Sequence, residues 1–231
     1  MIFPELVPAK FIKRHNRFSA GVRLEQERVA DVYVPTTGRL TGVLRPGCQV
    51  WLEPAENPDR KTRFTMALAE LDSGGFCSTN AHLANNLFYE AVKKGELAAF
   101  PYRDIDREVS YGNSRLDFRL LEGDQACWVE IKSVTFAEDG IGRFPDAPTA
   151  RGRRHLGELA KLVSLGERAS VVFIAQREDA AKFAPFEEID PDFAEVLRQI
   201  TDLGVETHAF RCRVNKEYVR IDEEIPVDLF G

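Results

Sequence analysis

The residues best suited to chemistry lie in one short segment, SRLDFRLLEGDQACWVEIKS, which spans residues 114–133. Its two apolar-patterned runs are joined by Gly123-Asp124, a dipeptide favoured in the two-residue turns of β-hairpins. A hairpin centred on this turn places Asp117 opposite Glu130, with Cβ atoms about 4.5–5.5 Å apart. Lys132 follows Glu130 by two residues, so it points to the same face of the sheet. The hairpin is therefore predicted to bring two carboxylates and an amine together.

Two carboxylates that face each other repel and need a positive partner. A divalent cation is suited to this position, because Mg²⁺ prefers oxygen ligands and often uses one or two carboxylates. Beside such a cation, Lys132 could orient an attacking water and stabilise negative charge on a phosphate. The pattern thus predicts metal-assisted phosphodiester hydrolysis. The alternative is a solvated charge cluster in which Arg115 and Lys132 neutralise the two acids, and spacing alone leaves both open.

Two further residues could join this site. Glu90 lies at the border of the apolar stripe of the predicted helix AHLANNLFYEAVKKGEL, so it could face the sheet. It could instead form an i, i+4 ion pair with Lys94 on the solvent side. Gln176 ends the buried run VVFIAQ, and polar groups at the carboxyl ends of such strands often line ligand crevices. A simple strand-ending glutamine is the alternative.

In order along the chain, these residues resemble the E…D…ExK…Q signature of PD-(D/E)xK nucleases. Longer segments resemble, also in order, the sugar fermentation stimulation protein A family (SfsA), over about residues 10 to 225. These segments are FIKRHNRF, PTTGRL, LANNLFYEA, SRLDF, EIKSVTF and FPDAPTARGRRHLGEL. One departure is visible, since the family usually has Asn-Thr-Gly where this chain has Thr36-Thr37-Gly38.

The resemblance implies an OB-like barrel for nucleic-acid binding in residues 1–80 and a restriction-endonuclease-like α/β domain with a mixed sheet in residues 81–231. It also implies a DNA-binding protein and a nuclease dependent on Mg²⁺ or Mn²⁺. Asp117 and Glu130 would be metal ligands and Lys132 the catalytic lysine. Glu90, as a further ligand, and Gln176 would support them. Two alternatives stay open: a non-catalytic DNA-binding regulator of sugar (maltose) metabolism that keeps a relic site, and a phosphohydrolase of small phosphorylated molecules.

Basic residues indicate where nucleic acid could bind. The net charge of the chain is −6, but residues 1–80 hold 11 Lys and Arg against 9 Asp and Glu. The segment KFIKRHNRF mixes cations with aromatic rings, as single-strand binding surfaces do. Alternatively, it is a solvated strand whose Phe11 and Phe18 enter the core. The candidate nucleic-acid contacts are Lys13, Arg14, Arg17, Phe18, Arg39, Arg115, Arg151, Arg153 and Arg154.

The last three of these arginines follow Thr149, a suitable N-cap for a helix over about residues 150–165. Cations in the first turn oppose the helix dipole. A phosphate bound at the helix start would explain their position. A basic helix face paired with Glu158 or neighbouring acids is the alternative.

The pattern of elements changes near residue 80. Residues 10–79 read as short strands separated by turns, typical of a small β-barrel. Beyond them we expect the order α-β-β-α-β-α-β, with helices flanking a mixed sheet. The unbroken apolar run ASVVFIAQ predicts a buried strand in a parallel pair.

Bulk properties exclude several classes. The 231 residues contain no apolar run long enough to span a membrane, and the N-terminus lacks the continuous apolar core of a signal peptide. The 4 cysteines are scattered without a CxxC pair, and the 4 histidines show no metal-ligand spacing. We therefore expect a cytoplasmic protein without structural zinc. The sequence leaves the oligomeric state open, a homodimer included.

Overall fold

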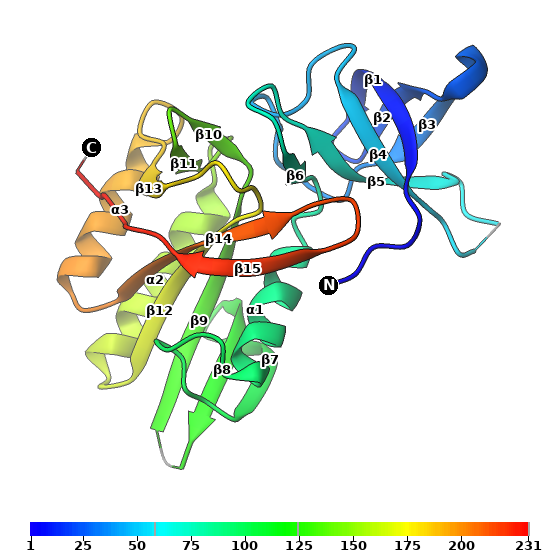
Figure 1. Ribbon diagram of the computed structural model, residues 1–231. Coiled ribbons are helices and arrows are strands. Elements are labelled where there is room, and N and C mark those ends of the chain that lie inside the picture. The colour runs from blue at the N-terminus through cyan, green and yellow to red at the C-terminus, as the bar shows by residue number, and fades with distance from the viewer. Residues whose placement is uncertain (58, 124, 231) are drawn as a thin grey trace.

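The computed structural model describes residues 1–57, 59–123 and 125–230. A β-barrel formed by the N-terminal part lies beside a larger α/β domain, as Figure 1 shows. Within the described residues, no helix combines the length and apolar character needed to cross a membrane. All 4 cysteines lie in these residues and are unpaired.

The barrel is built from five strands and closes on itself. Their order is β3-β2-β1-β4-β5, and β3 pairs in parallel with β5 at Tyr33 and Thr65 to complete the ring. Alternate residues such as Val32 and Val34 point inward and are fully buried, which explains why these segments form strands around one core. This confirms the predicted OB-like barrel. The strands are β1 (Val7–Asn16), β2 (Ser19–Arg23), β3 (Val29–Tyr33), β4 (Gln49–Pro54) and β5 (Phe64–Glu70), with β6 (Phe76–Ser78) added beside β5 and a 3-10 turn at Glu25–Glu27.

The α/β domain is organised around a six-stranded mixed sheet of order β15-β14-β12-β9-β8-β7. The central strand β12 is parallel to both β9 and β14, and its interior residues are buried. This confirms the parallel pair predicted from the apolar run at residues 169–176. The strands are β7 (Asp104–Tyr111), β8 (Ser114–Glu122), β9 (Gln125–Val134), β12 (Arg168–Ala175), β14 (Glu206–Val214) and β15 (Val219–Glu224).

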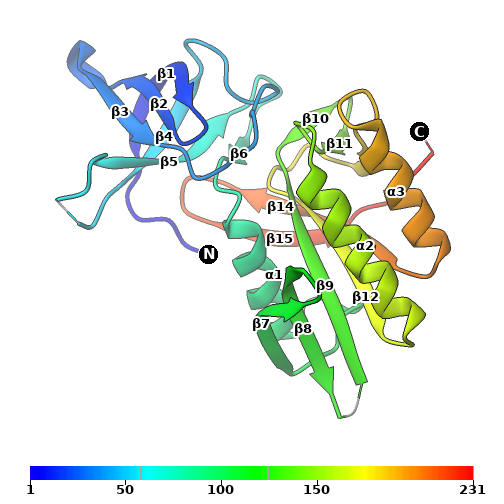
Figure 2. The same ribbon diagram turned by 180° about the vertical axis from the view of Figure 1, so that it is seen from behind.

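Three helices cover this sheet, with α1 (Leu83–Lys94) on one face and α2 (Ala150–Ser164) and α3 (Pro191–Asp202) on the other (Figure 2). Gly95 ends α1 with a left-handed φ of 70°, which a residue without Cβ adopts at little cost. Thr149 caps α2 as predicted, since its Oγ1 accepts a hydrogen bond of 3.0 Å from the N–H of Gly152. The predicted helices are confirmed.

Several strands lie outside the predicted order. They are β7, β15 and a small sheet of β10 (Phe136–Glu138), β11 (Ile141–Phe144) and β13 (Lys182–Pro185). Strands of three or four residues are too short to show a period, and the edge strand β7, DIDREVSY, is largely polar. Their formation depends on the neighbouring strands more than on local sequence.

Direct hydrogen bonds join the barrel to the α/β domain. The N–H of Ser78 donates to the carbonyl of Gln176 at 2.9 Å, where β12 ends. On the other side, the N–H of Leu40 donates to Oδ2 of Asp146 at 3.0 Å. Gly38 packs so closely there that a Cβ on it would lie 2.8 Å from the same carboxylate oxygen. We call these contacts the interdomain latch, defined by Gly38, Leu40, Ser78, Asp146 and Gln176.

Candidate active site

The predicted hairpin forms, and its register holds over most of its length. Phe118 lies opposite Val129 and Glu122 opposite Gln125, although Asp124 of the predicted turn falls outside the described residues. The recorded strand pairs end at Phe118, and Oδ2 of Asp117 accepts a hydrogen bond of 2.7 Å from the N–H of Ile131. Asp117 therefore lies close to the strand that carries Glu130 and Lys132.

Asp117 is held from two sides. Besides the N–H of Ile131, the side-chain amide of Asn85 in α1 donates to its Oδ1 at 2.7 Å. Burial and the nearby Glu130 carboxylate nevertheless raise the pKa of Asp117 to about 6, against the opposing effect of Lys132 and the two hydrogen bonds. Burial and the neighbouring carboxylate therefore disfavour the ionised form of Asp117.

Glu130 is buried and uses one of its two oxygens. Its Oε1 contacts Nζ of Lys132 and Nδ1 of His155, each at 2.5 Å. Burial alone would raise the pKa of Glu130, but Lys132 and His155 outweigh it and hold this pKa below its ordinary value. Its Oε2 is buried without a hydrogen-bond partner among the described residues. A buried carboxylate oxygen in this state is suited to a metal ligand.

His155 was not included in the predicted site. It lies on α2, and Nε of Arg151 donates to its Nε2 at 3.3 Å. A guanidinium can only donate, so Nε2 of His155 is the acceptor and carries no proton. The ring proton is therefore on Nδ1, which donates a hydrogen bond to Glu130. His155 shares the buried face of α2 with Leu156 and Leu159, and this polar residue in an apolar stripe was the available signal. Asn85 lies outside the buried stripe of α1, so no comparable signal marked it in the sequence.

Glu90, the predicted third carboxylate, has a partner that the sequence analysis did not predict. Oε2 of Glu90 lies 3.3 Å from the amino group of Met1. Neither Asp117 nor Lys94, the predicted alternative partner, is its contact. Asn85 is the α1 residue that reaches Asp117, and five further residues rotate Glu90 by about 140° around the helix. Among the described residues, no group of three or more His, Cys, Asp or Glu side chains could hold a metal, so the acidic set consists of Asp117 and Glu130.

Gln176 lies at the domain junction. Its side chain is fully buried, and Nε2 donates to Oγ of Ser133 at 2.7 Å and to the carbonyl of Asn80 at 3.0 Å. Through Ser133 it contacts the end of the strand that carries Lys132. Gln176 thus holds the end of the strand that carries Lys132 and connects it to Asn80, where the barrel joins the α/β domain.

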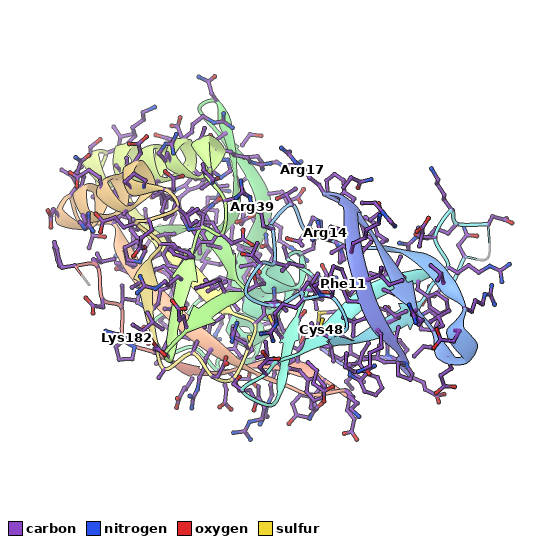
Figure 3. The ribbon with its side chains drawn as sticks, turned by 90° about the horizontal axis from the view of Figure 1, so that it is seen from above. Phe11, Arg14, Arg17, Arg39, Cys48 and Lys182 are labelled. Carbon is purple, nitrogen blue, oxygen red and sulfur yellow. The ribbon has the colours of Figure 1, made fainter. Side chains whose placement is uncertain are left out.

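A cavity of about 830 Å³ opens beside these residues, between the two domains. Lys132 and Asn85 line it from the α/β domain, while Arg14, Arg17 and Arg39 line it from the barrel (Figure 3). Its full lining adds mostly polar and small residues, together with the larger apolar Ile131 and Phe144: Asn16, Thr36, Thr37, Gly38, Thr41, Ala81, Ser133, Thr135, Pro145, Asp146, Ala147, Pro148 and Thr149. The acidic pair lies behind the part of this wall formed by Lys132 and Asn85.

Of the barrel residues predicted to bind nucleic acid, Arg14, Arg17 and Arg39 line this cavity, whereas Lys13 and Phe18 do not. Arg14 donates to the backbone carbonyls of Asn16, Arg17 and Gly38, which stabilises the loops that form the wall. No described residue offers the side chains of Arg17 and Arg39 a hydrogen bond or ion pair, and both are exposed. Lys13 is exposed as well. The two phenylalanines differ, since Phe11 is buried in the core whereas Phe18 is 47% exposed and stacks on Tyr33.

The predicted basic residues of the α/β domain are mostly occupied. Nη1 of Arg153 contacts the buried Asp190 at 2.6 Å, so this arginine is held within the protein, as the alternative of pairing with acids expected. Arg115 lies 3.3 Å from Glu108, and Nε of Arg154 donates weakly to Ser114 at 3.4 Å. Arg151 contacts His155. The free cationic surface near the site therefore comes mainly from the barrel.

A closed five-stranded barrel joined to an α/β domain with a mixed sheet defines the class of this protein. Residues 12–79 match the family model described as the SfsA N-terminal OB domain. Residues 82–218 match the model described as the sugar fermentation stimulation protein RE domain. The chain belongs to the sugar fermentation stimulation protein family, as its resemblance predicted.

Relatives match over nearly the full length of the chain. A sugar fermentation stimulation protein homolog of Moorella thermoacetica is 44% identical over 228 residues, with 97% of each chain covered. The homolog of Caldanaerobacter subterraneus subsp. tengcongensis is 40% identical over 225 residues, again with 97% of each covered. Among solved structures, Pyrococcus furiosus SfsA in complex with Ca²⁺ is similar with a TM-score of 0.90 and 32% identity, covering 99% of this chain and 98% of that one.

Proposed function

We propose that the protein is a divalent-metal-dependent nuclease of the PD-(D/E)xK type that hydrolyses phosphodiester bonds in DNA. The observation that carries this proposal is the pairing of Asp117, whose pKa is raised, with the unpartnered Oε2 of Glu130, behind the cavity wall formed by Lys132. This set of oxygen donors is suited to Mg²⁺ or Mn²⁺. That the similar Pyrococcus furiosus protein forms a complex with Ca²⁺ supports a divalent cation here.

Asp117 and Glu130 would hold the cation, and His155 fixes Glu130 through its Oε1 so that Oε2 stays free. When bound, a divalent cation polarises the phosphate and lowers the pKa of water. The Lys132 amine lines the cavity and can stabilise negative charge that develops on the phosphate. Asn85 positions Asp117 by donating to its Oδ1.

DNA is the proposed substrate because the cavity presents cations in a protein of net charge −6. Four cationic side chains line it, Arg14, Arg17, Arg39 and Lys132, against one anionic side chain, Asp146. A phosphodiester backbone is attracted to such a surface.

A second candidate function is a DNA-binding regulator that no longer cleaves. It is favoured by the small acidic set, since Glu90 contacts the amino group of Met1 instead of Asp117. It is also favoured by the 2.5 Å contact that keeps Lys132 on Glu130. This candidate predicts salt-dependent DNA binding without cleavage.

The experiment that separates the two is cleavage of labelled DNA in Mg²⁺ or Mn²⁺ by the wild type and by Glu130→Ala and Lys132→Ala. Cleavage that needs the metal and is lost in both variants would support the nuclease. Circular dichroism of each variant controls for folding. If none of the three proteins cleaves but all bind DNA, the nuclease is contradicted and the regulator is supported.

A further inference from the structure

The cavity has walls from two different domains. On the barrel wall, Arg17 and Arg39 are exposed cations without a described partner, and Arg14 lines the same wall (Figure 3). On the opposite wall, Lys132 and Asn85 cover the acidic pair. A ligand that reaches Lys132 must therefore lie between the domains.

The interdomain latch fixes the width of this space. The Leu40 contact to Asp146, at 3.0 Å, joins the barrel loop to the loop before α2 at the cavity itself. Leu40 adopts a left-handed φ of 57°, which is unfavourable for a branched side chain, and its N–H is held in place by this bond. The N–H of Ser78 bonded to Gln176 at 2.9 Å fixes the other side. Bonds on both sides oppose a rigid-body opening of the domains.

The size of the cavity limits what can enter. Its volume of about 830 Å³ lies in the range of sites that hold one small molecule, about 300 to 1,000 Å³. A DNA duplex presents a major groove alone about 12 Å wide and needs a much larger open surface to lie against. A few unpaired nucleotides, by contrast, are small enough to fit in this cavity.

An exposed aromatic ring neighbours the cationic wall in sequence, just outside the cavity lining. Phe18 follows Arg17 directly, and its ring stacks on Tyr33, with centroids 6.5 Å apart. The guanidinium of Arg60 lies over the ring of Tyr33, 5.2 Å from its centroid. Cationic grooves with exposed rings are typical of surfaces that bind single strands by base stacking.

We propose that the cavity accepts an unpaired DNA strand and excludes a continuous duplex. The strand passes between the domains with its phosphates at Arg17 and Arg39 and a base on Phe18. The preference for an unpaired strand is set by the cavity and the interdomain latch and does not require catalysis. Only the cleavage of the bound strand rests on the proposed nuclease function. Duplex DNA with an unpaired extension would be engaged through that extension.

Binding is tested first, with the wild-type protein in EDTA so that no cleavage occurs. Fluorescence anisotropy would compare a single strand, a blunt duplex and a duplex with an unpaired extension. We expect the single strand and the extension to bind at least roughly tenfold more tightly than the blunt duplex, since unpaired bases can stack on a ring. Equal affinity for the blunt duplex, or displacement of the strand by mononucleotides at equal concentration, would overturn the proposal.

Variants then locate the strand. Arg17→Ala combined with Arg39→Ala should weaken single-strand binding roughly tenfold and reduce its salt dependence. Arg28→Ala, an exposed barrel arginine outside the cavity lining, is the matched control and should change binding less than about twofold. Asp146→Ala releases Leu40 and should reduce the preference for the single strand. Unchanged binding in the double variant would contradict the proposal.

Cleavage in Mn²⁺ distinguishes the two proposals. Preferred binding of the single strand without any cleavage would leave the binding inference standing and contradict the nuclease. Cleavage of a blunt duplex as fast as a single strand would support the nuclease and contradict the inference about its substrate.

Discussion

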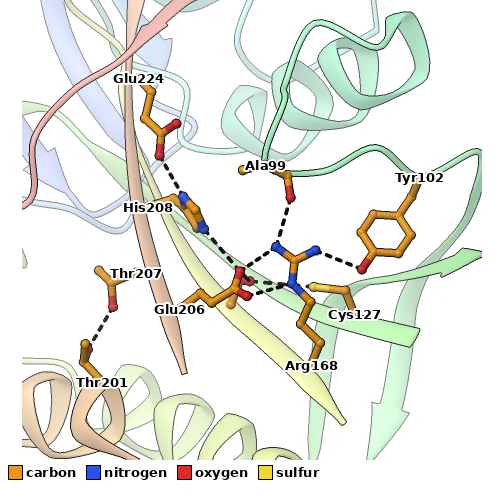
Figure 4. A network of polar contacts seen from close by, with 10 residues as sticks. Ala99, Tyr102, Cys127, Arg168, Thr201, Glu206, Thr207, His208 and Glu224 are labelled. Atoms are coloured by element: carbon orange, nitrogen blue, oxygen red, sulfur yellow. Dashed lines mark hydrogen bonds and ion pairs between the residues drawn. The ribbon is translucent and has the colours of Figure 1, made fainter. Parts of the chain in front are cut away.

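Two networks of acids and bases in the α/β domain differ in how their charges are balanced. Between β12 and β14, Arg168 donates to both oxygens of Glu206 at 2.7 Å, and Ser170 and His208 also contact this carboxylate (Figure 4). Burial alone would raise the pKa of Glu206, but the hydrogen bonds from Arg168 and its neighbours lower it. Here the ionised acid is favoured by the folded state.

In the network behind the cavity wall the two acids differ, since the pKa of Glu130 is lowered like that of Glu206 whereas that of Asp117 is raised. The pKa of Asp117 is raised to about 6, and Oε2 of Glu130 has no hydrogen-bond partner in the described part of the chain. The network between β12 and β14 thus pairs its acid with a cation, whereas Asp117 has no ion-pair partner among the described residues. That deficit is where an external cation would act. Substituting one carboxylate by its amide in each network tests this contrast.

The largest effect is expected from Asp117→Asn on cleavage. Loss of one of two anionic ligands should lower metal-dependent cleavage by roughly 10³-fold or more. Glu206→Gln, which makes the same chemical change away from the cavity, should leave cleavage within about twofold of the wild type. Initial rates at saturating Mn²⁺ measure both. Equal loss in the two variants would remove the distinction between the networks.

The same Asp117→Asn variant should be more stable than the wild type at pH 8 without divalent cations. Because the folded-state pKa of about 6 exceeds the ordinary 3.8, protonation of Asp117 stabilises the fold fully below pH 3.8. This stabilisation is lost as the pH rises through about 6. We expect a gain of about 2 kcal/mol in the free energy of unfolding at pH 8, and little gain at pH 4. In the variant, Asn85 can rotate its amide to accept from the new side chain.

Urea denaturation in EDTA at both pH values measures this gain. Adding Ca²⁺ at pH 8 should raise the melting temperature of the wild type and leave that of Asp117→Asn nearly unchanged. A variant that is less stable than the wild type at pH 8 would show that Asp117 is satisfied without a cation.

Glu206→Gln should change stability in the other direction. Since the folded state lowers the pKa of Glu206, its charge stabilises the protein above the ordinary pKa of a glutamate, and this contribution is lost as the pH falls through the lowered value. The carboxylate and Arg168 are each about one-third exposed, so screening limits the loss to about 1 kcal/mol at pH 7. Urea denaturation at pH 7 would measure it, and a stabilised variant would contradict the contrast.

Among the acids predicted for the site, the smallest effect is expected at Glu90. Its carboxylate contacts the amino group of Met1 rather than the site, so Glu90→Gln should change cleavage by less than about threefold. A reduction comparable with that of Asp117→Asn would restore Glu90 as a ligand and show that α1 turns when a cation binds.

How far the sequence predicts this site depends on how local each contact is. The approach of Asp117 to the strand of Glu130 was predictable because a turn dipeptide and strand alternation set the register within twenty residues. The position of Glu90 was not, because the rotation of α1 is set by its packing on the sheet and on β15. Periodicity identifies a helix and its apolar face but leaves residues at the border of that face undecided.

Contacts between distant segments were also missed. His155 reaches Glu130 across 25 residues, from a helix on the other side of a loop. The cavity requires loops of both domains, and Arg14, Arg17 and Arg39 were predicted to bind nucleic acid without any indication that they line one space with Lys132. Residue types indicated the chemistry, whereas the arrangement depends on how the two domains dock.

The bonds across the latch have a consequence for modularity. The backbone carbonyl of Gln176 accepts a hydrogen bond from the N–H of Ser78 in the barrel. The side-chain amide of Gln176 donates to the carbonyl of Asn80, between the two domains. Removing residues 1–80 would therefore uncap the carboxyl end of the central strand and expose Gln176, which is now fully buried. The barrel therefore completes the structure of the α/β domain, and we expect neither domain to be exchangeable without loss of stability.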